Sequence, residues 1–165
     1  MTTTTFTKEH LEKLRNSFPK LRYGHDRVTS DRTPETDPTP YNCIAWAAGD
    51  SARWWEYDPE GDLGFEVYWP QNITDDNTTS SWVKVFETEL GYTLTKNSKY
   101  ERGFEKIAIY AKGKTPTHVA RQIGNKKWTS KLGFGYDIEH GNLHCLSGHT
   151  DSEYGDVVKL LKRKL

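Results

Sequence analysis

Cys43 and His118 are the two residues whose types and positions could together perform nucleophilic chemistry. Cys43 lies in the segment YNCIAWAAGD, whose alanines, leading Asn42 and closing Gly49 predict a short helix over residues 41–49. A thiol in the first turn of a helix meets unpaired backbone N–H groups, which favour a thiolate and could also hold an oxyanion. A cysteine taken alone is more often a small buried hydrophobe, so the interpretation depends on a partner.

His118 is that partner, and it falls on a strand predicted over residues 117–123. Ala120 and Gln122 share its face of the strand, and a small neighbour leaves room for another group to approach the imidazole. A histidine brought beside a cysteine by the fold can take the thiol proton and later protonate the leaving amine. Cys43 and His118 are therefore predicted to be nucleophile and general base.

A third residue should orient the imidazole through its other nitrogen. The Gly124-Asn125 pair predicts a hairpin that places residues 126–130 beside 117–123, so that Ser130 falls opposite His118. That placement favours Ser130, whereas a carboxylate such as Asp137 would hold an imidazolium better, and the choice stays open. The candidates are Thr129, Ser130, Asp137, Glu139 and His140.

Aromatic residues are numerous in a chain that is otherwise poor in apolar residues. We expect Trp46, Trp82 and Trp128 in the core, while Trp54 and Trp55 fit a core or a cleft wall equally well. The residues considered for substrate binding are Asn42, Trp54, Trp55 and Trp128.

The segment with His140, His144, Cys145 and His149 contains several side chains that could bind zinc. Gly141 and Gly148 interrupt any helix that would align these side chains, and no CxxC pair accompanies them. We therefore predict neither a metal nor a cofactor.

The remaining patterns predict a single α+β domain over residues 1–165. Residues 1–40 would form a helix (8–18) followed by an arm rich in Pro, Thr and Asp (29–40), and residues 41–165 would form the core. Ser80 or Ser81 would cap an amphipathic helix that ends at Gly91. Strands are predicted at 106–110, 117–123 and 126–130, and a closing helix from Tyr154 onward, with Val157, Leu160 and Leu161 facing inward.

Composition argues against two classes of partner. Lys plus Arg equals Asp plus Glu, so the chain lacks the basic excess of most nucleic-acid-binding domains. No segment approaches the ~20 apolar residues of a membrane span, and the N-terminus has no apolar signal region. Two cysteines are too few for a disulfide framework. These features predict a cytoplasmic protein, although export as a signal-less effector would leave no trace in the sequence.

Several motifs together resemble known proteins. The helix-start Cys43, the strand IAIYAKGKTPTHVARQI and the following NKKWTSKLG resemble the papain-like peptidases and amidases of the NlpC and CHAP types. YNCIAWA, THVARQ and WTSKLG also resemble an uncharacterised bacterial family. The first resemblance implies a papain-like fold, with N-terminal helices packed on a small antiparallel sheet. It also implies a cysteine-dependent hydrolase or acyl-transfer enzyme.

The substrate of such an enzyme would be a peptide, protein or cell-wall amide, and the reaction that of a peptidase, amidase or glutamine deamidase. The alternative is a non-catalytic binding or immunity-type module in which Cys43 is a buried structural residue.

Overall fold

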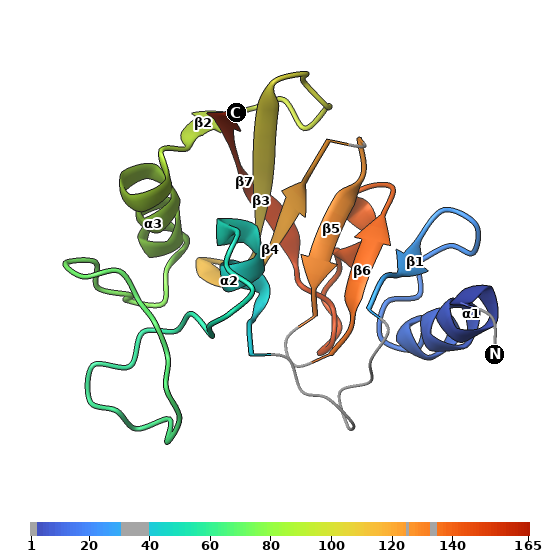
Figure 1. Ribbon diagram of the computed structural model, residues 1–165, viewed down its shortest axis with the longest axis horizontal. Helices are drawn as coiled ribbons and strands as arrows, with labels where there is room; N and C mark the ends of the chain where they lie inside the picture. The colour runs from blue at the N-terminus through green and yellow to red at the C-terminus, as the bar shows by residue number, and fades with distance from the viewer. Residues whose placement is uncertain (1–2, 31–39, 125, 133–134) are drawn as a thin grey trace.

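The described part of the protein is built on one antiparallel sheet of seven strands. The computed structural model describes residues 3–30, 40–124, 126–132 and 135–165. The strand order is β1-β6-β5-β4-β3-β7-β2, and neighbouring strands are antiparallel throughout (Figure 1). The strands are β1 (Arg27–Val28), β2 (Thr93–Thr95), β3 (Phe104–Lys112), β4 (Thr115–Gln122), β5 (Trp128–Lys131), β6 (Asp137–His140) and β7 (Asp156–Lys164).

Within the described residues, three α-helices and one 3-10 helix accompany the sheet. They are α1 (Thr3–Leu14), α2 (Cys43–Ala48), α3 (Thr79–Leu90) and η1 (His144–Leu146). In Figure 1, α2 and α3 lie over one part of the sheet, whereas α1 lies at the opposite end, beside β1. None of the helices in the described residues has the length and apolar character needed to cross a bilayer.

The sheet carries an apolar cluster on each face. On what we call the α2 face, Ile107, Ile109, Val119 and Leu161 pack with residues of α2 and α3. On the other, called the η1 face, Ala108, Tyr110 and Ala120 pack with Cys145 and Leu146 of η1 and with Leu11 of α1. Because both faces are covered, the middle of β3 is buried at every position rather than at alternate ones.

Two helix predictions are confirmed by their ends. Asn42 precedes α2, its side chain accepts the Ala45 N–H at 3.2 Å, and Gly49 ends the helix with φ 85°. Gly91 ends α3 with φ 72°, although this helix begins at Thr79, with Thr78 as N-cap and not Ser80 or Ser81. The first helix starts earlier than predicted and ends at Leu14.

The prediction of a closing C-terminal helix is wrong, because Asp156–Lys164 forms β7 between β3 and β2. Val157 pairs with Tyr110 and Lys159 with Ile109, so Val158 is an extra residue in the ladder. This irregularity puts Val157 and Leu160 on the same η1 face, three positions apart, while Leu161 faces α2. A strand with an extra residue and with apolar side chains on both faces thus imitates the 3–4 residue spacing of a helix.

The predicted fold class is also wrong in its proportions. Instead of N-terminal helices packed on a small sheet in a papain-like arrangement, a seven-stranded sheet dominates and the helices are short. The strands in segments for which neither a helix nor a strand is predicted, β1, β2 and β6, contain two to four residues each. Segments this short have no measurable periodicity. Within the arm predicted at 29–40, residues 31–39 lie outside the described part, as does Asn125 of the predicted hairpin.

Candidate functional site

Cys43 is the first residue of α2, and its thiol lies beside β4. Backbone N–H groups of Val119, Ile44 and Cys43 itself all interact favourably with the sulfur. β5 pairs with β4 only at Arg121 and Gln122, so its ladder does not extend to Val119. The sulfur therefore lies next to the peptide unit that joins His118 to Val119.

The Cys43 thiol is not activated in this resting structure. Burial raises the pKa of Cys43, and the three N–H groups together with the positive charge of Lys131 offset only part of that increase. The thiol is therefore protonated at neutral pH. The helix start supplies the expected hydrogen-bond donors, but desolvation outweighs them.

His118 lies on β4 with its ring on the η1 face. Val119, the next residue, packs with the α2 cluster, whereas the His118 ring is stacked on Tyr154 with centroids 4.2 Å apart. Among the described residues, no hydrogen bond joins the Cys43 thiol to this ring. The two predicted catalytic residues are thus close through the β4 backbone, without a hydrogen bond between their side chains among the described residues.

His118 and Ser130 are brought together as predicted, and the contact continues to a third strand. Ser130 Oγ lies 2.9 Å from His118 Nε2 and 2.8 Å from His140 Nε2. His140 Nδ1 in turn lies 2.9 Å from the carbonyl oxygen of Asn142. We call the set His118, Ser130, His140 and Asn142 the relay. It crosses β4, β5 and β6, and its three side chains are at most 1% exposed.

Both histidines of the relay are neutral at physiological pH. Burial lowers the pKa of His118 well below its ordinary value, and the neighbouring His140 lowers it further. Burial likewise lowers the pKa of His140 to about 4, although the Asn142 carbonyl and the charges of Asp26 and Glu139 act in the opposite direction. A neutral imidazole can serve as a base or as a hydrogen-bonding link.

Tyr154 is a site residue that the sequence analysis missed. Its ring lies parallel to His118, with an interplanar angle of 6°. Burial raises the pKa of Tyr154, and the charge that Cys43 would carry as a thiolate raises it further, so the phenol lies within electrostatic range of the sulfur. The segment around Tyr154 was expected to begin a helix, so no signal pointed to this role.

Asp137, the other candidate for orienting the imidazole, lies away from the relay. Its Oδ2 accepts a hydrogen bond of 2.6 Å from the Tyr41 hydroxyl. Its register partner on β5 is Lys131, one residue beyond Ser130, and residues adjacent on a strand point to opposite faces. Asp137 thus belongs to the surroundings of Tyr41 and not to those of His118.

Of the residues considered for substrate binding, Trp54 lines a groove near the entry to α2, and Trp128 lines a different one beside Gln122. Asn42 uses its side chain to cap α2 and to contact the Trp55 backbone. Trp55 and Trp128 are buried in the two apolar clusters. Trp54 lines a groove of about 400 Å³ together with Pro40, Ala52, Arg53, Phe65, Glu66, Val67 and Tyr68. Pro40 lies three residues before Cys43, so this groove adjoins the segment that leads into α2.

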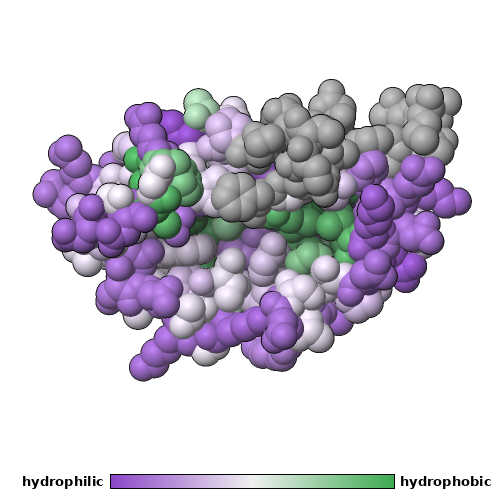
Figure 2. Space-filling view, turned by 90° about the horizontal axis from the view of Figure 1, so that it is seen from below, coloured by the Kyte–Doolittle hydropathy of each residue, from purple (hydrophilic) through white to green (hydrophobic). Residues whose placement is uncertain are grey.

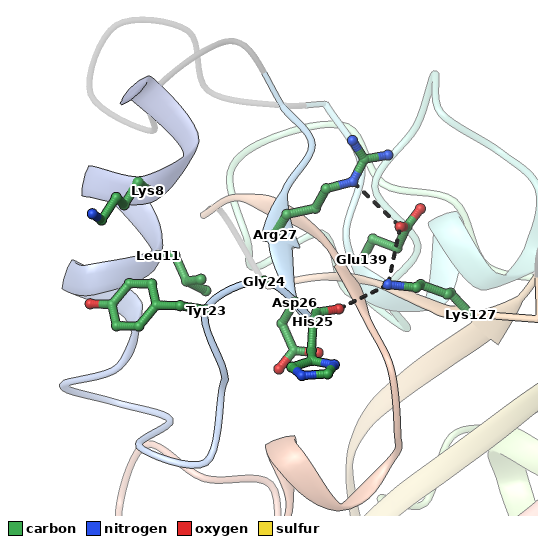
Figure 3. Close-up of a pocket in the computed structure, with 9 residues that line it drawn as sticks. All are labelled: Lys8, Leu11, Tyr23, Gly24, His25, Asp26, Arg27, Lys127 and Glu139. Carbon is green, nitrogen blue, oxygen red and sulfur yellow. Dashed lines mark hydrogen bonds and ion pairs between the residues drawn. The ribbon is translucent and has the colours of Figure 1, made fainter. Parts of the chain in front are cut away.

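Figure 2 shows the molecule from the side that is at the bottom of Figure 1, where the chain enters α2. Apolar residues are gathered in the middle of this end, and hydrophilic residues flank them. A second cavity, of about 280 Å³, lies between α1 and the edge of the sheet (Figure 3). Arg27 and Lys127 both approach the Glu139 carboxylate there, at 3.4 and 4.0 Å. The residues that line this cavity include neither Cys43 nor His118.

Three side chains of the histidine-rich segment have partners within the protein. His140 belongs to the relay, and the Cys145 thiol donates to the Asn142 carbonyl at 3.1 Å. His149 lies at the surface, 3.4 Å from Asp156. In the described residues, no three His, Cys, Asp or Glu side chains come together as metal ligands.

Comparison with known proteins places the chain in a family. No curated protein and no solved structure matches it. Residues 27–162 match a family model described as a domain of unknown function (DUF7689), and this match includes Cys43, the whole relay and all of the sheet except the last two residues of β7. The chain therefore belongs to the DUF7689 family.

Proposed function

We propose that this protein is a cysteine-dependent hydrolase or acyl-transfer enzyme acting on an amide bond, with Cys43 as nucleophile and His118 as general base. The observation that carries the proposal is the position of the Cys43 sulfur among three backbone N–H groups, next to the peptide unit of His118. Donors in that position could stabilise the negative charge that develops on an attacked carbonyl.

The reaction would start from a neutral pair. The Cys43 sulfur attacks the carbonyl carbon while its proton passes to His118, and the resulting imidazolium protonates the leaving amine. Water, or another amine, then attacks the thioester and releases the acyl group. Because the thiol and the ring are not hydrogen-bonded at rest, substrate binding must bring them within reach. Hydrogen bonds between catalytic groups often tighten only in the bound complex.

The groove beside Trp54 is the most suitable place for an acyl or peptide side chain. Trp54 and Phe65 contact each other edge to face, with centroids 6.1 Å apart, and Phe65 is 48% exposed. An apolar wall next to the entry to α2 favours a peptide or protein substrate with an apolar or aromatic side chain near the amide.

The test is acylation by an activated ester, p-nitrophenyl acetate, followed by intact mass and peptide mapping. We expect a thioester on Cys43 in the wild type and in Cys145→Ala, none in Cys43→Ala, and formation at least about 100-fold slower in His118→Ala. Circular dichroism would check that each variant is folded. A rate on Cys43 that does not depend on His118 would contradict the proposal.

A second candidate is a non-catalytic binding or immunity-type module with a structural Cys43. The raised pKa of Cys43 favours it, because a desolvated neutral thiol is typical of an inert packed cysteine. The same experiment separates the two functions. The module would release p-nitrophenol at equal rates in the wild type and in Cys43→Ala, and no thioester would form.

A further inference from the structure

We propose that the Asn142 carbonyl, acting through His140 and Ser130, fixes His118 as the tautomer with its proton on Nε2 and leaves Nδ1 as the free acceptor. The tautomer follows from the direction of each hydrogen bond in the relay. It deepens the proposed function, on which its catalytic meaning rests, but the tautomer itself is a property of the folded chain.

The donor and acceptor of each hydrogen bond are determined by the contact between His140, at the end of β6, and the Asn142 carbonyl. A carbonyl oxygen can only accept, so the 2.9 Å contact between Asn142 and His140 requires a hydrogen on His140 Nδ1. The carbonyl is itself held in place, since the Cys145 N–H donates to the Asn142 side chain at 3.0 Å and the Cys145 thiol donates to the same carbonyl. A neutral imidazole has one N–H, so His140 Nε2 carries a lone pair.

Ser130 on β5 links His140 on β6 to His118 on β4, and its hydroxyl has only one hydrogen to donate. His140 Nε2 accepts, so the Ser130 hydroxyl hydrogen must point toward it across 2.8 Å. A hydroxyl has a single hydrogen to donate, so Ser130 Oγ can contact His118 Nε2 only as an acceptor. His118 Nε2 therefore carries a hydrogen, and Nδ1 has a lone pair directed away from the relay.

The surroundings of the relay keep both rings neutral, so that each ring carries a single N–H. His118 faces Tyr154 and Tyr110 on the η1 face, and neither phenol ionises near neutrality because burial raises the pKa of each. Around His140 the charged groups are Asp26 and Glu139, and burial outweighs both. The thiol of Cys145, whose pKa burial raises to about 12, stays protonated as well.

The consequence for chemistry is that His118 receives a proton on Nδ1 alone. In the proposed reaction, Cys43 must then approach Nδ1, while Ser130 and His140 act as positioning residues that never touch the substrate. A ring with its hydrogen on the wrong nitrogen is a poor base even when its position is unchanged.

The tautomers can be measured without any substrate. In protein labelled with ¹⁵N-histidine, long-range ¹H–¹⁵N correlation at pH 7 should show a protonated Nε2 and a bare Nδ1 for His118, and the reverse for His140. Spectra of His118→Gln and His140→Gln assign the two rings, and His149→Gln, which alters an exposed ring, is the matched control. A protonated Nδ1 on His118, or an imidazolium form of either ring at pH 7, overturns the inference.

Two variants at Ser130 separate the relay from the reaction. Ser130→Ala should change which nitrogen of His118 appears protonated in the ¹H–¹⁵N spectrum, and should slow thioester formation on Cys43 by about 10-fold or more. Ser130→Thr keeps a hydroxyl, so it should restore both the wild-type spectrum of His118 and the rate of thioester formation. If the tautomers are as expected but no thioester forms, the inference about the His118 tautomer is confirmed and the proposed function is wrong. If a thioester forms while His118 carries its hydrogen on Nδ1, the inference about the tautomer is wrong and the proposed function is supported.

Discussion

The His118 imidazole is stacked on the Tyr154 ring, with centroids 4.2 Å apart and planes inclined by 6°. The backbone around Tyr154 holds this arrangement. Thr117, the residue before His118, donates its hydroxyl to the Tyr154 carbonyl at 2.5 Å. Gly155, which follows Tyr154, exchanges two backbone hydrogen bonds with Gly148. The position of the histidine is thus coupled to the turn over residues 148–155.

Gly155→Ala should disturb that turn strongly. Gly155 has φ 81°, and a Cβ there would lie 2.2 Å from the Ala111 carbonyl oxygen, so strain and a backbone clash add. We expect a loss of unfolding free energy of roughly 3 kcal/mol or more, measured by urea denaturation. Gly61→Ala is the matched control, because Gly61 has φ 73° with open space around it. A loss at Gly155 no larger than at Gly61 would refute the clash.

Alkylation of Cys43 should depend steeply on pH. Since burial raises the pKa of the thiol above 9.0, the thiolate fraction at pH 7 is small and grows about tenfold per pH unit through pH 9. Iodoacetamide labelling of the Cys145→Ala variant, followed by mass spectrometry, isolates Cys43 from the second thiol. A rate that levels off below pH 8 would show that the thiol is activated even without substrate.

Ser130→Ala should lower the stability of the fold as well as disturb the orientation of the His118 ring. Removing the hydroxyl leaves two buried imidazole nitrogens without their partner, which costs about 1–3 kcal/mol. Thermal and urea unfolding measure the loss. Ser51→Ala, a change at an exposed serine, should be nearly neutral. Equal stability of the two variants would mean that the relay contributes little to the folded state.

Stability should fall between pH 6.5 and pH 5, before the carboxylates titrate. The pKa of His140 is about 4 in the folded chain and 6.5 in the unfolded chain, so below pH 6.5 the unfolded chain binds more protons. Stability is therefore complete above pH 6.5 and is lost as the pH falls toward 4. The loss from His140 is on the order of 2 kcal/mol at pH 5. His140→Gln should flatten this part of the profile, and an unchanged slope would exclude His140 as its source.

The parts predicted correctly depended on local chemistry. Asn42 and Gly49 delimit α2 because a cap and a left-handed glycine act within one turn of the chain. The pairing of β4 with β5, and with it the contact between His118 and Ser130, followed from a short connection that allows only neighbouring antiparallel strands. These features needed no knowledge of distant residues.

Neither the C-terminal strand β7 nor the protonation state of Cys43 could be predicted from neighbouring residues in the sequence. β7 exists because β3 and β2 offer it edges to pair with, and its irregular register gives Val157, Leu160 and Leu161 a helical spacing. The sequence placed Cys43 at a helix start, which favours a thiolate, whereas its raised pKa depends on how deeply the fold buries it.

The sequence by itself thus determined which residues stand at helix ends and on neighbouring strands, because hydrogen bonds within a turn or a hairpin involve adjacent segments. Only the tertiary structure decided that Cys43 is desolvated, that Tyr154 covers His118 and that His140 completes the relay. Burial and contacts between distant segments depend on the whole sheet, and no local pattern encodes them.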